Sequence, residues 1–486
     1  MVDSEISPTE ELPAAVEAAE ENSPATATAT LEPNSEDGAA PNSEENAEGQ
    51  TEGESAPALP PVPEKVNLAE FQQQTLAQLY DLGASLGLRV GGSRSKHQLV
   101  FEVLVYYSRR GTIIEATGIV EIMKEGHGII RDSRYNYMPY PDDIFLPAAA
   151  VRRYQLRNAQ MVNVIARAPR DHKERNLVAE QVTHVEGVLA DQWEPPVAFD
   201  KLTALFPTDR IVLENRRTKS VSSRCIDLIS PLGKGQRGLI CAPPRGGKTI
   251  LLKDIAVSIQ ENHPEIELMI LLLDERPEEV TDFQETVQVS PNCHVTASTF
   301  DEPAERHQQV AEMVMERSKR LVEMKKDVVI LLDSLTRLSR GYNNCLRGKG
   351  PLGSGGVDQR ALQRAGKFFG TARKVEEGGS LTILASALIE TESKMDDVIF
   401  EEFKGKGNME INLDRELLER RIYPAINISK TGTRKDDLLY HPDEFRRILA
   451  IRRQLTQLPA GEAMEVLTKH IRATQNNAEL LLTGLR

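Results

Sequence analysis

The chain has 486 residues, with 59 Lys or Arg against 73 Asp or Glu, which gives a formal net charge of −14. That length is enough for about three domains of roughly 150 residues each. No run of about 18 apolar residues is present, so we expect no membrane span and no membrane partner. The absence of a C-x-x-C pair and of a secretory signal pattern favours the reducing cytoplasm for the four cysteines, Cys225, Cys241, Cys293 and Cys345.

The first 64 residues are acidic and contain no aromatic side chain. They hold 16 carboxylates and no Lys or Arg, so the rest of the chain is close to neutral, with 59 basic against 57 acidic residues. Such a segment buries too little apolar area to offset the entropy of ordering it, and we predict a disordered tail at 1–64. An inert solubilising tail, a competitor for basic RNA sites and a docking segment all remain open.

Two small modules are predicted next. Residues 65–113 are expected to be helical, because Asn67 followed by Glu70 is a helix-start pattern and apolar residues then recur at helical spacing. Residues 114–187 change to short strands, four or five in number, which suggests a small barrel, and residues 188–207 are expected to link it to the next domain. The strands are predicted at 119–122, 127–130, 143–146 and 161–165.

From residue 208 to 486, apolar strands alternate with amphipathic helices. Strands are predicted at 238–241, 268–273, 294–297, 328–332, 381–385 and 425–428. Continuous apolar strands separated by helices indicate an α/β domain with a mostly parallel sheet covered on both faces.

A phosphate-binding loop is predicted at residues 242–249, APPRGGKT, between a strand and a helix. It fits G-x-x-x-x-G-K-[ST] except that Ala242 replaces the first glycine. The two glycines let backbone N–H groups approach a phosphate, Lys248 would reach the β- and γ-phosphates, and Thr249 would offer its hydroxyl to Mg²⁺. A glycine-rich turn with a coincidental lysine is the alternative. The predicted ATP contacts are Pro244, Arg245, Gly246, Gly247, Lys248, Thr249 and Ile250.

Two other strands run into carboxylates. Residues 328–332 are followed by Asp333, and residues 268–273 by Asp274 and Glu275. Ligands of parallel sheets bind at the carboxyl ends of the strands, so Asp333 is predicted as a second Mg²⁺ ligand beside the threonine hydroxyl. Glu275 is predicted to orient or deprotonate the attacking water. Asp274 in that role, a solvated helix start and a turn-forming Asp333 are the alternatives.

Several longer strings resemble the Rho family of bacterial transcription termination factors. They are PLGKGQRG at 231–238, DERPEEV at 274–280, TFDEPA at 299–304 and FKGKGNME at 403–410. The resemblance covers roughly 67–480 and implies a RecA-like motor domain, an OB- or cold-shock-like RNA-binding barrel, and a homohexamer with ATP between subunits. One departure is Arg245, where the family commonly has Lys, so the charge is kept while its geometry changes.

The resemblance also implies roles for single residues. Glu275 is similar to the family's catalytic carboxylate, and Arg276 to an arginine beside it at the site. Arg434 looks like an arginine finger that the next subunit supplies to stabilise charge on the transferring phosphoryl group. Arg421 resembles a second interface arginine, and Tyr423 the aromatic residue that packs on adenine. Salt-bridged surface arginines are the alternative.

RNA contacts are implied in the barrel and in two loops facing the ring's hole, at 346–356 and 391–395. The candidates are Arg131, Phe145, Arg170 and Glu174 in the barrel and Lys349 and Lys394 in the loops. The chain departs from the family where aromatic residues are usual, with His127, Ile129 and Asn176 in their place. Stacking is worth about 1–3 kcal/mol per base, so we expect weaker base recognition and more reliance on phosphate contacts.

The leading hypothesis is an RNA-dependent ATPase that uses ATP and Mg²⁺, moves 5′ to 3′ on single-stranded RNA and dislodges the RNA polymerase elongation complex. A second hypothesis is another ring ATPase with the same core, of the rotary or secretion type. A third is an RNA-binding regulator with an idle motor, against which the intact set of Lys248, Thr249, Asp333, Glu275 and Arg434 argues. RNA-stimulated hydrolysis distinguishes them.

Overall fold

The computed structural model describes residues 61–88, 92–171, 174–287, 292–346 and 352–485. All of these belong to one compact unit of the chain. Nearly all of the predicted tail, and Lys349, lie outside the described residues.

The helical module consists of α1 (Leu68–Phe71), α2 (Leu76–Ser85) and α3 (Lys96–Ser108). Asn67 caps α1, as its pattern predicts, because its side-chain oxygen accepts from the N–H of Ala69 at 2.9 Å. Thr75 and Ser95 begin the next two helices with reciprocal capping boxes. The module packs into the same buried core as the barrel that comes after it in the chain.

The barrel is closed, and its strands are β2 (Ile113–Ile122), β3 (Gly128–Arg131), β4 (Ile144–Leu146), β5 (Met161–Arg167) and β6 (Leu177–Val185). The order is β2-β3-β4-β6-β5, and β2 also pairs with β5, which closes the sheet. Burial alternates along β5, so every second side chain enters the core. The four strands predicted in this region are present, and β6 is a fifth.

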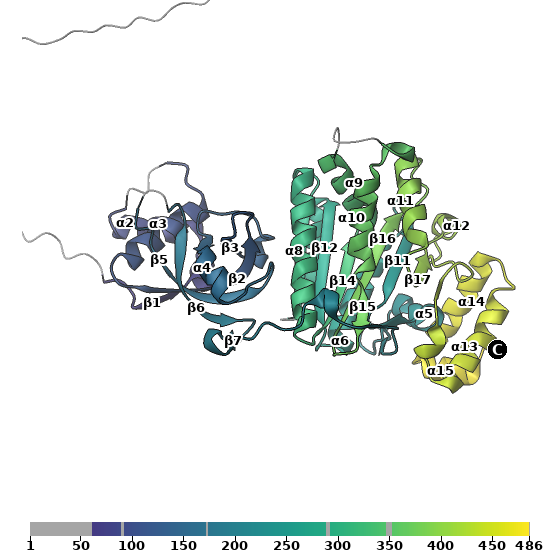
Figure 1. The fold of residues 1–486 in the computed structure, drawn as a ribbon. Helices are drawn as coiled ribbons and strands as arrows, with labels where there is room; N and C mark the ends of the chain where they lie inside the picture. The colour runs from purple at the N-terminus through teal and green to yellow at the C-terminus, as the bar shows by residue number, and fades with distance from the viewer. Residues whose placement is uncertain (1–60, 89–91, 172–173, 288–291, 347–351, 486) are drawn as a thin grey trace, which may run out of the picture. The chain divides into compact units, whose positions relative to one another are not determined.

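The motor domain is built on a mostly parallel sheet in the order β13-β12-β14-β16-β11-β17-β18 (Figure 1). The strands are β11 (Arg237–Ala242), β12 (Glu267–Glu275), β13 (Cys293–Thr299), β14 (Asp327–Asp333), β16 (Ser380–Leu388), β17 (Met409–Asn412) and β18 (Gly432–Thr433). The strand predicted at 425–428 was wrong, because Ile426 makes only an isolated bridge to Leu413. β17 pairs with β11 in its place.

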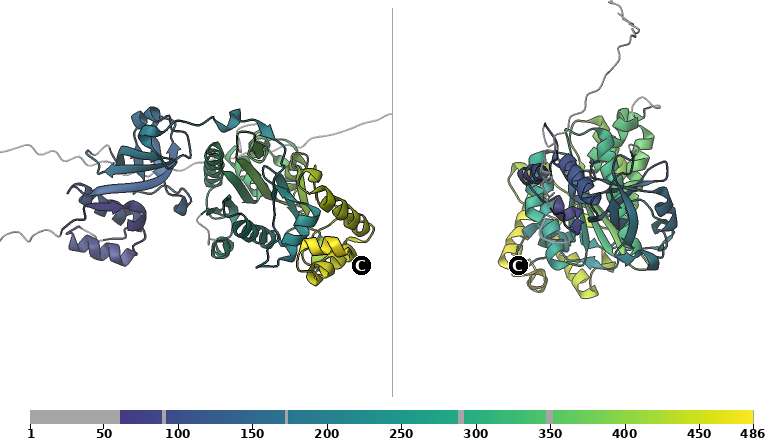
Figure 2. Two further views of the ribbon diagram at one scale, coloured as in Figure 1. Left: turned by 90° about the horizontal axis from the view of Figure 1, so that it is seen from below. Right: turned by 90° about the vertical axis from the view of Figure 1, so that its left-hand side faces the viewer.

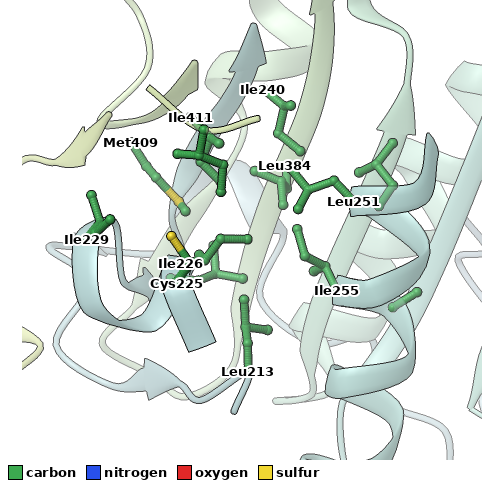
Figure 3. Close-up of a cluster of buried hydrophobic side chains, with 14 of the residues drawn as sticks. Leu213, Cys225, Ile226, Ile229, Ile240, Leu251, Ile255, Leu384, Met409 and Ile411 are labelled. Carbon is green, nitrogen blue, oxygen red and sulfur yellow. The ribbon is translucent and has the colours of Figure 1, made fainter. Parts of the chain in front are cut away.

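Two apolar cores lie on the two faces of this sheet, because successive residues of β12 alternate between them. One core is shared with α8 (Ala304–Glu323), α9 (Leu335–Leu346), α10 (Gln359–Gly370) and α11 (Lys394–Lys404). The other is shared with α5 (Val221–Ile229), α6 (Lys248–Asn262), α7 (Pro277–Val287), α12 (Arg415–Glu419), α13 (Pro442–Leu455), α14 (Ala460–Ala473) and α15 (Asn477–Thr483). Figure 3 shows part of it, with Cys225, Ile226, Leu251 and Ile255 near Leu384. The last three helices lie together beside α5 (Figures 1 and 2).

The segment at 188–207 does more than link the two domains. It contains β7 (Val188–Leu189) and β8 (Ala204–Leu205), and β8 pairs with β15 (Arg373–Val375) at the margin of the motor sheet. Its backbone is also fixed at Phe199, whose N–H donates to the buried carboxylate of Glu323 at 2.7 Å.

Helix α8 also contacts the barrel through polar groups. Arg317 pairs with Glu186 at 2.6 Å, and both side chains are buried. Gln309 donates to Glu121 of β2 at 2.7 Å. Because buried ions are costly unless paired, this pairing fixes the barrel against α8. Within the described residues, no helix has the length and apolar character needed to cross a membrane.

Candidate functional site

The phosphate loop connects the end of β11 to the start of α6, as its sequence predicts. Gly247 caps α6 with φ +78°, a conformation that side chains with a Cβ rarely adopt. A Cβ on Gly246 would lie 2.7 Å from the carbonyl oxygen of Pro243, so that position also requires glycine. Pro244 and Arg245 are exposed. The loop therefore presents backbone N–H groups at a helix N-terminus, where a phosphate binds favourably.

The first turn of α6 carries the other predicted ATP contacts. Thr249 is partly buried, and Ile250 is 67% exposed on the outer side of the turn. An exposed apolar side chain beside a phosphate loop is available for contact with a nucleotide's sugar or base.

Lys248, Glu275 and Asp333 are brought together at the carboxyl ends of three strands. The ammonium group of Lys248 lies 3.0 Å from Glu275 Oε1 and 2.5 Å from Asp333 Oδ1. Both carboxylates are almost fully buried. Burial lowers the pKa of Lys248, but the two carboxylates outweigh it, so the pKa is raised and the lysine stays charged.

Asp333 has one oxygen available for a cation. Its Oδ1 accepts from the hydroxyl of Ser386 at 2.8 Å, whereas its buried Oδ2 has no hydrogen-bond partner among the described residues. Buried polar atoms are normally satisfied, so this oxygen fits a missing ligand. Within the same residues, no group of three or more His, Cys, Asp or Glu side chains could hold a metal by itself. Mg²⁺ usually takes one or two protein oxygens together with phosphates and water, and Asp333 Oδ2 could be one of them.

Glu275 is aimed by a bulge in β12. The register with β13 shifts between Leu273 and Glu275, and Asp274 in between has φ +56°. Burial, and then the charge of Asp333, raise the pKa of Glu275 well above its usual value, while Lys248 opposes the shift. A buried carboxylate with a raised pKa suits a general base.

Arg337 was not foreseen by the sequence reasoning. It lies on α9 and approaches Glu275 Oε2 at 3.4 Å and Asp274 Oδ2 at 3.5 Å. Its position in the first turn of the helix that follows Asp333 was the available signal, because that turn begins at the carboxyl end of β14.

Three other predicted ATP residues lie on exposed segments. Arg276 precedes α7 with an exposed side chain and has no ion-pair partner in the described parts of the chain. Arg421 and Tyr423 follow α12, and Tyr423 is 57% exposed. Among the residues that the structure describes, no hydrogen bond or ion pair joins these three to the Lys248 group.

Arg434 lies at the opposite end of the sheet from the phosphate loop. Its N–H donates to the carbonyl of Asn408 at 2.8 Å, where β18 pairs with the first residue of β17. The first residue of β17 is also paired with the start of β11. The phosphate loop, in contrast, follows the end of β11. A six-residue strand spans roughly 17–20 Å, so Arg434 cannot act on a nucleotide bound by its own Lys248.

Arg131 is not a free cation in the barrel. It is 8% exposed, and its guanidinium pairs with Glu121 at 2.8 Å and with Asp143. Burial, the largest influence, raises the pKa of Asp143 to about 6 despite this arginine. Phosphate contact by Arg131 would therefore require it to leave existing partners.

The other barrel candidates are more accessible. Phe145 is partly exposed, and its ring centroid lies 5.0 Å from that of His127, which gives two adjacent rings. Glu174 accepts twice from Arg167 at 2.8 Å and also from the N–H of Arg170. The bond from Arg167 lowers the pKa of Glu174 to about 2, so it stays charged.

Arg170 is exposed and lies 3.4 Å from Glu180. Asn176, at a position where the family has an aromatic side chain, donates to the carbonyl of Pro141 at 3.3 Å. Lys394 begins α11 with an exposed side chain.

Comparison with known proteins covers both domains. Residues 116–191 match the family described as Rho termination factor, RNA-binding domain, and residues 222–432 match the ATP synthase alpha/beta family, nucleotide-binding domain. The chain is 51% identical over 435 residues to the transcription termination factor Rho of Akkermansia muciniphila, with 90% of each chain covered. It is 47% identical over 417 residues to that of Aquifex aeolicus, covering 85% of this chain and 94% of the relative.

A likeness of fold also extends to a solved structure of a prototypical ATPase from the type III secretion system of pathogenic bacteria. The TM-score is 0.52 at 22% sequence identity, and the match covers 64% of this chain and 94% of that chain.

Proposed function

The chain belongs to the Rho family of transcription termination factors, and on that premise we propose that six copies form a ring that moves along nascent single-stranded RNA and dislodges RNA polymerase. It is a transcription termination factor in which an RNA-binding barrel is joined to a RecA-like, RNA-dependent ATPase and helicase domain. The proposed domains are a helical module at 65–113, the barrel at 114–187 and the motor at 208–486. The proposed place of action is the cytoplasm, where nascent bacterial RNA is made.

One observation carries the proposal of a ring. Arg434 lies at the far end of β11 from Lys248, so one chain has a phosphate loop and an arginine that cannot meet. Two copies side by side, each supplying one half, would complete the site. A transferring phosphoryl group then gains a cation from the second copy.

The proposed reaction uses residues at the edge between β11, β12 and β14. Mg²⁺, held by Asp333 Oδ2, the Thr249 hydroxyl and the phosphates, would supply charge stabilisation when bound. Lys248 exchanges its two carboxylates for phosphate oxygens, and Glu275 accepts a proton from water as the water oxygen bonds to the γ-phosphorus. The bond from the γ-phosphorus to the β-phosphate oxygen breaks in the same reaction, and ADP leaves with that oxygen.

The two other hypotheses are weaker. The secretion ATPase is similar in fold alone, and the match of residues 116–191 to an RNA-binding domain favours RNA as the partner. An idle motor would not need to keep Lys248, Glu275 and Asp333 in mutual contact.

Steady-state ATP hydrolysis measured with and without single-stranded RNA tests the proposal. RNA is expected to raise the rate, and ATP is expected to drive release of transcripts from stalled elongation complexes. A rate that does not respond to RNA, in a protein that binds RNA, would contradict it.

A further inference from the structure

The last residues of strand β13 hold the backbone of Glu275, the proposed general base. Thr299 pairs with Glu275 in the sheet, and the N–H of Phe300 donates to the carbonyl oxygen of Glu275 at 3.2 Å. On the other side of β12, the pairing with β14 extends to Leu272 and stops before the bulge. The direction in which Glu275 points therefore depends on where the end of β13 lies.

The barrel reaches this part of β13 through the side chain of Asn136. This residue follows a short 3-10 helix, η1 (Ser133–Tyr135), and has the left-handed φ of +53°, which asparagine tolerates better than most residues. Its Oδ1 accepts a hydrogen bond from the N–H of Ala297 at 2.9 Å. Because β13 is an edge strand of the motor sheet, Asn136 supplies an acceptor that a neighbouring strand would otherwise provide.

Buried contacts with α8 fix the turn that carries Asn136. Arg306 of α8, which is almost fully buried, donates to the carbonyl oxygens of Asn136 and Tyr137. The ring of Tyr137 is buried in the core that α8 shares with β12. The hydrogen bond from Ala297 therefore goes to a turn that the motor domain itself holds in place.

The next residue of β13 is also fixed to the α8 region. The hydroxyl of Ser298 lies 2.7 Å from Nδ1 of His307 and donates to the carboxylate of Glu302. Burial lowers the pKa of His307, although the charge of Asp274 opposes the shift, so the ring is neutral at neutral pH. A neutral ring with its proton on Nδ1 satisfies both bonds, because Ser298 can accept from His307 and donate to Glu302.

We propose that Asn136 is a positioning residue for ATP hydrolysis, which acts on Glu275 through the end of β13. Residues 297–300 span about 10 Å of extended chain, from the bond with Asn136 to the bond with Glu275. Without its acceptor, the buried N–H of Ala297 loses its partner and the end of β13 is free to shift. The proposal rests on the proposed role of Glu275, because it assigns the placing of that carboxylate to the barrel.

The same turn connects β13 to the part of the barrel where RNA contacts are proposed. Asn136 lies shortly after Arg131, the last residue of β3, and β3 pairs with β4 at Ile129 and Phe145. RNA bound across β3 and β4 is therefore expected to influence the hydrolysis step through this turn. That consequence is separate from the positioning role, and it has a separate test.

The rate constant of single-turnover ATP hydrolysis tests the positioning role, because unfolded protein lowers the amplitude of that reaction and not its rate constant. Asn136→Gly removes the acceptor and keeps the backbone conformation, since glycine adopts positive φ freely. With RNA present, the rate constant should fall about three- to thirtyfold, less than the roughly 10²-fold loss that a 1 Å misplacement can cause. The affinity for ATP should stay the same, because Lys248 and the phosphate loop are unchanged.

Two further variants distinguish positioning from a general loss of stability. Asn136→Asp keeps an acceptor oxygen and tolerates the left-handed conformation, so it should restore the rate constant to within about twofold. Asn158→Ala removes another asparagine of the barrel, whose side chain accepts from the N–H of Ile122 at 3.0 Å and contacts Met313 of α8. Neither of those contacts involves β13, so this variant should keep the unmodified rate constant.

An unmodified rate constant in Asn136→Gly, no recovery in Asn136→Asp, or an equal fall in Asn158→Ala would overturn the positioning role. Glu275→Gln is measured alongside. If it is slow while Asn136→Gly is not, the positioning role alone fails. If Glu275→Gln also hydrolyses ATP at the unmodified rate, the assignment of the base fails together with the positioning role.

The influence of RNA is measured as the ratio of the rate constants with and without RNA. Asn136→Gly should lower this ratio while RNA still binds with the unmodified affinity. A ratio that the substitution leaves unchanged, at a reduced rate constant, would overturn the route from RNA and retain the positioning role.

Discussion

Lys248 has two roles that a single substitution removes together. It is the expected cation for the phosphates, and without nucleotide it also separates the buried carboxylates of Glu275 and Asp333. Removing one partner of a buried ion pair typically costs about 3–5 kcal/mol, because the remaining charge is left uncompensated. Loss of activity in Lys248→Ala therefore has to be interpreted together with its thermal stability.

The role of Glu275 can be tested without disturbing its shape. Glu275→Gln keeps the side-chain volume and removes the carboxylate, so ATP binding should persist while single-turnover hydrolysis slows by about 10²- to 10⁴-fold, as for loss of a general base. The rate of hydrolysis and the affinity for ATP are measured separately. If Glu275→Gln hydrolyses ATP at the unchanged rate, Asp274 becomes the candidate for the general base.

The pH dependence should reveal the environment of Glu275. Only the ionised carboxylate can take a proton from water, and burial and Asp333 raise its pKa above the usual 4.5, so kcat/KM should fall as the pH drops through that raised pKa. Arg337 opposes the shift. Arg337→Gln should therefore move the acid limb of kcat/KM to higher pH.

The control for that experiment is one turn further along the same helix. Arg340 pairs with Asp396 at 2.9 Å and not with Glu275, so Arg340→Gln should leave the acid limb in place. If Arg337→Gln leaves the acid limb of kcat/KM in place, Arg337 does not influence the group that titrates there.

At the scale of elements, strands β3 and β4 carry several of the RNA contacts proposed for the barrel. Ile129 of β3 is directly opposite Phe145 of β4, and the ring of His127 lies beside that of Phe145. The basic partner expected on the same strand, Arg131, is largely neutralised by Glu121 and Asp143. This face of the barrel therefore offers the paired rings of His127 and Phe145 for stacking, and fewer free charges than the sequence suggested.

RNA binding should respond to rings added at this position. His127→Phe with Ile129→Phe should tighten binding by about 1–3 kcal/mol per recovered stack, and should increase discrimination between pyrimidine and mixed single strands. Ile113→Phe adds a ring at an exposed position at the other end of β2 and serves as the control. Affinity is measured across a salt series, because phosphate contacts give a steep salt dependence.

In the unmodified protein, a strong preference for oligo-C with little dependence on salt would contradict this interpretation. It would mean that Phe145, Glu174 and their neighbours recognise bases without the missing aromatic residues.

At the scale of the whole molecule, the polarity of the motor sheet separates the two halves of the proposed catalytic site. Lys248 lies beyond the end of β11 and Arg434 beside its beginning. Helix α8 contacts the barrel through the buried pair of Arg317 and Glu186, which links the barrel to the motor domain. In the proposed ring, assembly would therefore complete the catalytic site.

Mixed rings should reveal this division. Lys248→Ala and Arg434→Ala are each expected to be inactive, the first through lost phosphate binding and the second through lost transition-state stabilisation with binding retained. Mixing the two should restore part of the ATPase rate, because some interfaces then combine an intact loop with an intact arginine. Wild-type hydrolysis by Arg434→Ala would refute the shared site.

The sequence by itself determined the features that depend on neighbours along the chain. The phosphate loop, the helix cap at Asn67 and five strands of the motor sheet were predicted at nearly their observed positions, because glycine requirements, caps and continuous apolar runs are local signals. The carboxylates that end β12 and β14 were predicted from the rule that ligands bind at the carboxyl ends of parallel strands.

Only the tertiary structure decided which distant residues meet. In the folded chain β17, and not residues 425–428, lies beside β11. Arg131 pairs with two carboxylates whose spacing in the sequence does not predict the contact. The fold also brings Arg337 to Glu275, and it places a side chain of the barrel beside the last residues of β13. Such contacts join residues tens to hundreds of positions apart, and they are set by packing and by the pairing of buried charges, which local patterns do not encode.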